Sequence, residues 1–186
     1  DAIISSLRTA LSETTDRHFS DKELSCVIGV TGEDGLSMLG ISDAKSLGQK
    51  WNYYMKKYHD SIRLFDGIKE LIAALKKRHI HLGIVTSELK HEYEADFLHF
   101  GIEQYFDTVI LADATQKHKP FPDPLLKYID TAHAEKQDVL YIGDTLYDVQ
   151  CASSAEVASG LALWGCKSIA HIRADYYFKT PLDVLS

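Results

Sequence analysis

The sequence contains few residues that could cross-link the chain. Among 186 residues there are three cysteines, Cys26, Cys151 and Cys166. They are odd in number and widely spaced, without a Cys-x-x-Cys pair, which argues against a disulfide scaffold and favours a reducing compartment. We therefore expect a cytoplasmic protein.

Long apolar runs and an excess of positive charge are also lacking. No run approaches the roughly 20 apolar residues that span a bilayer, and no signal-peptide pattern opens the chain, so we expect no membrane partner. The formal net charge of −7 argues against a nucleic-acid partner, because such binding needs a basic surface. It does not exclude an anionic ligand, since a bound divalent cation can dominate the field of a small site.

The chain has enough apolar residues, 45%, for one good core and a small second domain. Up to about residue 62 the patterns are helical, without a convincing strand. We expect helices near 1–17, 21–28, 36–39 and 44–58. Thr31–Gly35 reads as a loop that either overhangs a site or forms an exposed turn.

Residues 63–186 alternate between helix and strand. Strands are expected at 81–85, 108–112, 139–143, 158–164 and 176–178. Helices are expected at 67–78, 88–100, 124–133 and 149–154, with a helix or turn at 169–174. Asp66 and Asp123 are the expected N-caps of the first and third helices. This alternation predicts an α/β fold with a Rossmann-like parallel sheet covered by helices on both faces.

Two acidic residues follow the strand at 139–143. Asp144 comes directly after it, at the carboxyl edge where ligands bind in open α/β sheets. Asp148 follows about one helical turn later. Carboxylate oxygens suit Mg²⁺, which usually takes one or two carboxylates together with waters and phosphate. The alternative is that Asp144 caps a helix and Asp148 faces solvent.

Lys119 and Thr86 are expected at the same edge of the sheet. Lys119 lies in a loop stiffened by three prolines, which can aim an ammonium group at a phosphoryl group. Thr86 and Ser87 end the strand at 81–85, where a hydroxyl and helix-start N–H groups can cradle an anion. The alternatives are that Lys119 is a solvated surface residue, that Lys117 takes its place, or that Thr86 is only an N-cap.

Together, Gly83-Ile-Val-Thr-Ser87, Lys119-Pro120 and Gly143-Asp-x-x-x-Asp148 resemble the motifs of the haloacid dehalogenase superfamily. The resemblance is to its phosphoglycolate phosphatase-like branch and extends over essentially the whole chain. It implies a helical cap at 1–62, an α/β core at 63–186 and Mg²⁺ as cofactor. It also implies a phosphatase of a small phosphorylated metabolite that works through an aspartyl-phosphate. The sequence does not decide the oligomeric state, which is either a monomer or a homodimer.

The resemblance also implies roles for individual residues. Asp144 would bind Mg²⁺ directly, and Asp148 would act through a water or orient the lysine. Thr86, with Ser87, would hold the phosphate, and Lys119 would offset its charge. A sugar-phosphate mutase and a pyrophosphatase on the same scaffold are alternatives within the enzyme class.

The first motif of the family, Asp-x-Asp-Gly-Thr, does not occur in the sequence. Its first Asp would be the nucleophile and its second the general acid and base. We expect that the strand carrying it has been lost from the chain and belongs between the strands ending at Thr86 and Asp144. If it is truly absent, the alternative is a catalytically inactive protein that binds phosphate or a partner. Glu88 and Glu156 are further departures from the family pattern.

Overall fold

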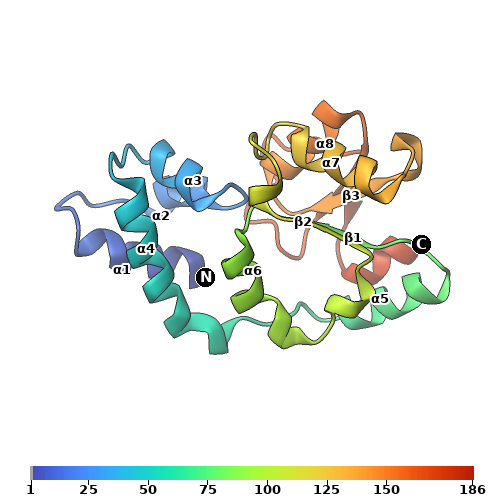
Figure 1. Ribbon diagram of the computed structural model, residues 1–186, viewed down its shortest axis with the longest axis horizontal. Helices are drawn as coiled ribbons and strands as arrows, with labels where there is room; N and C mark the ends of the chain where they lie inside the picture. The colour runs from blue at the N-terminus through green and yellow to red at the C-terminus, as the bar shows by residue number, and fades with distance from the viewer. Residues whose placement is uncertain (1) are drawn as a thin grey trace.

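The computed structural model describes residues 2–186. Figure 1 shows helices α1–α4 gathered apart from a second unit that contains all the described strands. The helices are α1 (Ala2–Ser12), α2 (Asp21–Leu24), α3 (Gly32–Met38), α4 (Ala44–Met55), α5 (Ile68–Lys77), α6 (Lys90–Asp96), α7 (Asp123–Ala132) and α8 (Leu146–Ala155). The strands are β1 (Gly83–Val85), β2 (Thr108–Ile110), β3 (Leu140–Gly143), β4 (Ala158–Ala162) and β5 (Tyr176–Phe178).

The helical unit comprises residues 2–61 and has its own apolar core. Helix α1 packs along α4, and α3 packs on α4 as well. Leu7, Leu24 and Leu36 are completely buried between these helices. The short 3₁₀ helix η2 (Lys56–Ser61) ends the unit.

The α/β unit, residues 68–186, contains parallel strands only. Strand β1 pairs with β2, and β3, β4 and β5 form a second sheet in that order. Helices α7 and α8 pack on the strands, and α5 packs on the terminal 3₁₀ helix η7 (Pro181–Leu185). The apolar core around Leu125, Cys151 and Ala152 has no member in common with the core of the helical unit. The α/β class predicted from the sequence is confirmed.

The two sheets are not joined by backbone hydrogen bonds within residues 2–186. Strands β1 and β3 each pair on one side only, β1 with β2 and β3 with β4. The hydroxyl of Tyr141 on β3 donates to the carbonyl of Val85 on β1, at 3.1 Å. Leu140 at the start of β3 is 39% exposed, unusual for an apolar residue in a parallel sheet.

Several predicted helix boundaries are wrong. Helix α1 ends at Ser12 rather than near Arg17, and the amides of Thr14 and Thr15 both donate to the carbonyl of Leu11 in its last turn. Asp123 is not the N-cap of α7, because Pro122 holds that position and Asp123 is the first residue of the helix. Asp66 is not the N-cap of α5. Gly67 holds that position in a left-handed conformation (φ 88°), and no side chain caps the helix.

The segment Thr31–Gly35 is not a simple loop. The side chain of Thr31 accepts a hydrogen bond from the amide of Asp34, and Thr31 is thereby the N-cap of α3. Residues 169–174 contain a turn and no helix. None of the helices formed by residues 2–186 has the length and apolar character needed to cross a bilayer.

Candidate functional site

The centre of the site is a buried ion pair between Lys119 and Asp148. The ammonium nitrogen Nζ lies 2.7 Å from Oδ1 of Asp148, and the two side chains are 9% and 6% exposed. Lys119 comes from the loop before α7, where its peptide bond to Pro120 is cis. Asp148 lies in the first turn of α8. The solvated-lysine and solvent-facing alternatives are therefore excluded for this pair.

Asp148 is held by a capping box at the start of α8. Thr145 is the N-cap, and its hydroxyl accepts from the amide of Asp148. In return, Oδ2 of Asp148 accepts from the amide of Thr145 at 3.0 Å and from its hydroxyl at 2.6 Å. The hydroxyl of Tyr141 lies 3.1 Å from Oδ1. Asp148 thus accepts from Lys119 and from two donors of Thr145, and the single proton of the Tyr141 hydroxyl is shared between Oδ1 and the carbonyl of Val85. Such an environment matches a residue that orients Lys119.

Opposing effects set the pKa of Asp148. Burial acts to raise it, but Lys119 and the donors of Thr145 outweigh burial and hold the pKa below its ordinary value. For Tyr141, burial first and Asp148 second hold the pKa well above the ordinary value, so this hydroxyl stays protonated. Asp148 is therefore ionised at neutral pH, with the protonated Tyr141 beside it.

Asp144 lies beside this pair at the carboxyl end of β3. Burial and the neighbouring charge of Asp148 raise its pKa, whereas Lys119 lowers it. Its side chain lies against the backbone of Gly165, where an added Cβ would be 3.0 Å from Cβ of Asp144. Asp144 lies at the same edge as Asp148 but, unlike Asp148, it is not part of the capping box.

The described residues fit a magnesium site only in part. Within residues 2–186, no group of three or more His, Cys, Asp or Glu side chains is gathered closely enough to hold a metal ion. Mg²⁺ commonly uses one or two carboxylates and completes its shell with water and phosphate. Asp144 fits that role, and Asp148 fits a supporting one.

Thr86 and Ser87 follow β1 at the same edge. The amide of Thr86 continues the pairing with β2 through the carbonyl of Ile110, at 3.0 Å. Its hydroxyl accepts from the amide of Glu88 at 3.2 Å. The hydroxyl of Ser87 donates to the carbonyl of Gly29 in the helical unit, at 3.0 Å. Thr86 thus ends β1 with its hydroxyl bonded to the amide of Glu88, whereas Ser87 contacts the other unit.

The segment around Gly29 and Asp34 lies over this edge of the sheet. Asp34 Oδ2 is 3.0 Å from Nδ1 of His118, the neighbour of Lys119. Gly29 has φ 91°, and a Cβ there would lie 2.6 Å from Oγ1 of Thr145, so the position requires glycine. The overhanging arrangement of this segment is therefore the one observed.

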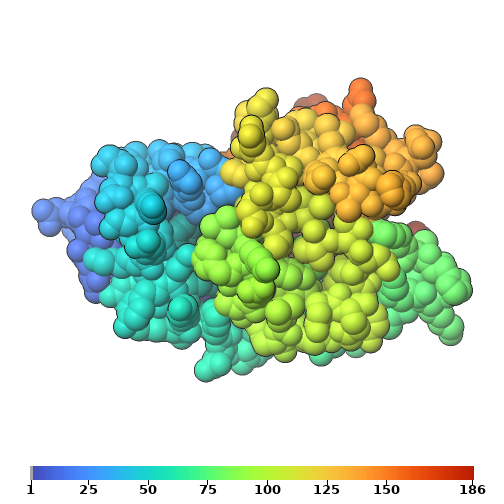
Figure 2. Space-filling model, in the orientation of Figure 1, coloured from blue at the N-terminus to red at the C-terminus, as the bar shows by residue number. Residues whose placement is uncertain are grey.

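Further contacts join the helical unit to α6. Nδ2 of Asn52 lies 3.2 Å from Nε2 of His91, and Nε2 of His59 lies 2.7 Å from Oδ1 of Asp96. Figure 2 shows the blue and cyan helical unit lying against the green and yellow part of the chain. These contacts hold the helical unit against α6.

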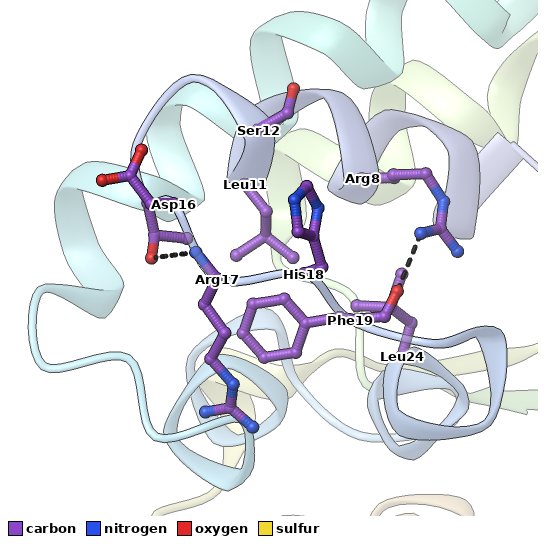
Figure 3. A pocket seen from close by; sticks show the side chains of 9 residues that line it. Arg8, Leu11, Ser12, Asp16, Arg17, His18, Phe19 and Leu24 are labelled. Atoms are coloured by element: carbon purple, nitrogen blue, oxygen red, sulfur yellow. Dashed lines mark hydrogen bonds between the residues drawn. The ribbon is translucent and has the colours of Figure 1, made fainter.

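A separate cavity of about 290 Å³ lies entirely within the helical unit, between residues 8 and 24. Phe19 and Leu24 form its apolar side. The guanidinium of Arg8 donates to the carbonyl of Phe19 at 2.8 Å, and that of Arg17 lies 4.3 Å from the centre of the Phe19 ring. In Figure 3 the two guanidinium groups do not converge, so the cavity offers no shared point for an anion.

Gly143 is required because β3 and α8 approach closely there. A Cβ at this position would overlap Cβ and Cγ of Asp148. We expect Gly143→Ala to lower the free energy of unfolding by about 2 kcal/mol through overpacking. Urea denaturation measures the change. The matched control is Gly48→Ala in α4, where the added Cβ meets only Leu36 Cδ1 at 3.9 Å. The free energy of unfolding of Gly48→Ala should rise by about 0.5–1 kcal/mol. A loss of equal size in both variants would contradict the role given to Gly143.

The sequence predicted Lys119, Asp144, Asp148 and Thr86 as site residues. In the structure Lys119 pairs with Asp148, Asp144 lies beside them at the end of β3, and Thr86 directly follows β1. Sequence reasoning missed Thr145 and Tyr141, which hold Asp148. The pattern Thr145-x-x-Asp148 is a capping-box signature and could have been found. The contact of the Tyr141 hydroxyl with Asp148 and the contact of Asp34 with His118 depend on tertiary packing. Such contacts leave no signal in the local sequence.

Comparison with known proteins places the chain in a family. The model of the haloacid dehalogenase-like hydrolases matches residues 1–162. The chain belongs to this family of hydrolases, as the motifs indicated.

Several relatives carry phosphatase names. The pyrophosphatase PpaX of Caldanaerobacter subterraneus is 35% identical over 136 residues, which cover 71% of this chain and 62% of the relative. That alignment spans less than two thirds of the relative. The pyrophosphatase PpaX of Bacillus mycoides is 25% identical, with 98% of this chain and 87% of the relative covered.

Solved structures share the fold. A protein from Lactobacillus plantarum named as a phosphoglycolate phosphatase has a TM-score of 0.89 and 30% identity, and 99% of this chain and 89% of that chain are covered. The beta-phosphoglucomutase of Clostridium difficile has a TM-score of 0.85 with 17% identity, and 98% of this chain and 85% of that one are covered. This second likeness concerns the fold alone.

Proposed function

We propose that the chain is the larger part of a Mg²⁺-dependent phosphatase that hydrolyses a small phosphorylated metabolite through an aspartyl-phosphate. The observation that carries the proposal is the buried Lys119–Asp148 pair beside Asp144 and Thr86. Burying an ammonium group is costly unless it is paired. A pair kept at the ligand-binding edge of a sheet supports a role in binding anions.

Each residue has a distinct task in this proposal. Asp144 binds Mg²⁺, which neutralises phosphoryl charge when it is bound. Lys119 offsets the remaining negative charge, and Asp148 fixes the position of its ammonium group. The hydroxyl of Thr86 and the amides that follow it hold the phosphoryl oxygens, as helix starts commonly do. Ser87 contributes its amide, because its hydroxyl is engaged with Gly29.

The nucleophile belongs to a strand between β1 and β3 in this proposal. Both strands are parallel and each has a partner on one side only. An unpaired buried backbone group costs about 1–3 kcal/mol, so an additional parallel strand there would be stabilising. A strand ending in Asp-x-Asp-Gly-Thr would place its first carboxylate between Thr86 and Asp144. Intact mass and N-terminal sequencing of the protein made from its natural gene test this point.

The helical unit acts as the cap. Its segment at Gly29 and Asp34 contacts Ser87 and His118 at the site, which supports a cover that excludes water during attack on phosphorus. The names of the relatives favour pyrophosphatase activity as the second candidate. A phosphate-binding protein without catalysis is the remaining alternative.

Phosphate release by the protein made from its natural gene, from a panel of monoesters and from pyrophosphate, with Mg²⁺ and with a chelator, tests the function. We expect release only with Mg²⁺, and a loss of about 10²-fold or more in kcat/KM for Asp144→Asn, the scale of removing one preorganised charge-stabilising group. Asp130→Asn, on the exposed side of α7, is the matched control and should keep full activity. Phosphate binding without any release would favour the inactive alternative.

A further inference from the structure

Glu88 places a carboxyl group at the rim of the site. Its backbone is fixed at both ends, because its amide donates to Oγ1 of Thr86 at 3.2 Å and its carbonyl accepts from the amide of Ala112 at 2.9 Å. Its side chain is mostly buried and interacts with the Thr86 hydroxyl and with the charge of Lys119. The carboxyl group therefore lies beside the groups that would hold a phosphoryl group.

Other carboxylates share this region. Burial, followed by the charges of Asp96 and Glu92 on α6, raises the pKa of Glu88 to about 7, against the opposing effects of Lys119 and Thr86. Burial also raises the pKa of Asp96, against the opposing charge of His59. Above neutral pH, Glu88 is mostly ionised, and the rim carries negative charge although Lys119 is close.

This rim lies on the side that faces the helical unit. Helix α6, which carries Glu92 and Asp96, meets the helical unit through His91 with Asn52 and through Asp96 with His59. The carboxyl group of Glu88 is influenced by Thr86 and Lys119 on one side and by Glu92 and Asp96 of α6 on the other. It therefore lies between the end of the site that would hold a phosphoryl group and α6.

We propose that Glu88 determines which leaving group the site accepts, favouring phosphate monoesters whose leaving group carries hydroxyl or ammonium donors over those with a second anionic group. This inference rests on the proposed function and names its class of substrate. A carboxylate accepts hydrogen bonds from such donors, whereas a second phosphate or carboxylate would be repelled in a partly desolvated site. Pyrophosphate would thus be a poor ligand despite the names of the relatives.

Isothermal titration at pH 8 with Mg²⁺ provides the test. The ligands are inorganic phosphate, pyrophosphate and O-phosphoethanolamine, and the proteins are the wild type, Glu88→Gln and Glu94→Gln. Glu94 is the matched control, since it lies on α6 with its side chain 52% exposed. Affinities are compared as ratios to inorganic phosphate in one buffer, so that binding of Mg²⁺ to the free ligands cancels between variants.

For Glu88→Gln we expect the affinity for pyrophosphate, relative to phosphate, to rise about tenfold, the scale of one close like-charge contact. The relative affinity for O-phosphoethanolamine should fall, and Glu94→Gln should change neither ratio. Unchanged ratios in Glu88→Gln, with phosphate still bound, would overturn the inference and leave the proposed function standing. No phosphate binding by any of the three proteins would overturn both.

Discussion

Replacing Lys119 with methionine should lower the free energy of unfolding at neutral pH by about 3–5 kcal/mol, because it leaves a buried carboxylate without its partner. Asp148 is 6% exposed at its side chain, and water cannot readily take the place of the ammonium group. The hydrogen bonds from Thr145 and Tyr141 would remain, but they do not neutralise the charge. Denaturation in urea measures the loss.

Lys117→Met is the control for this experiment. Lys117 is exposed, two residues before Lys119, and its ammonium lies 5.3 Å from the centre of the Phe121 ring. An exposed cation–π contact contributes about 0.5–1 kcal/mol at most. The double variant Lys119→Met/Asp148→Asn should recover much of the loss, because it removes the unpaired charge. Equal small losses in both single variants would contradict a buried pair.

Glu88→Gln should make the protein more stable at alkaline pH. The rise in the pKa of Glu88 from 4.5 to about 7 corresponds to a cost of about 3 kcal/mol for the ionised group in the folded state. Below pH 4.5 the carboxyl is protonated in both the folded and the unfolded protein, so nothing is lost. Between pH 4.5 and 7 the unfolded chain releases the proton first, and the stability of the wild type falls.

The gain in unfolding free energy for Glu88→Gln over the wild type should therefore be up to about 3 kcal/mol at pH 8 and below about 1 kcal/mol at pH 5. Guanidinium denaturation at the two pH values measures it. Glu94→Gln, which removes an exposed carboxylate, should change stability by less than about 0.5 kcal/mol at either pH. A gain of the same size at pH 5 and pH 8 would show that charge is not the cause. If the gain is confined to pH 8, stability and substrate choice both depend on the charge of Glu88, a common cost of functional sites.

The alternation of helix and strand was sufficient to predict a parallel α/β fold, because buried parallel strands must be apolar and short. The positions of Lys119, Asp144 and Asp148 followed from the same reasoning, since residues after parallel strands meet at one edge. The ends of the helices were harder to predict from the sequence. Gly67 holds the N-cap position in place of Asp66 because the chain enters α5 through a left-handed conformation that glycine adopts readily.

The contacts between the two units could not be predicted at all. Asp34 and His118 are 84 residues apart in the sequence, and neither residue type specifies the other. Tyr141 looked like one more apolar strand residue, yet its hydroxyl links the two sheets. At Glu156, the sequence indicated a turn that must differ or tolerate strain. The structure has it in the left-handed region (φ 60°) as the C-cap of α8.

The absence of shared members between the two apolar cores has a consequence for how the molecule loses its structure. The junctions named between the units are hydrogen bonds, such as Ser87 with Gly29, and histidine–carboxylate pairs, such as His59 with Asp96. Polar contacts of this kind exchange for contacts with water at little net cost. Apolar packing makes melting cooperative, and here it operates within each unit separately. The helical unit and the α/β unit should therefore melt as two independent events, and amides in one core can exchange with solvent while the other core stays intact.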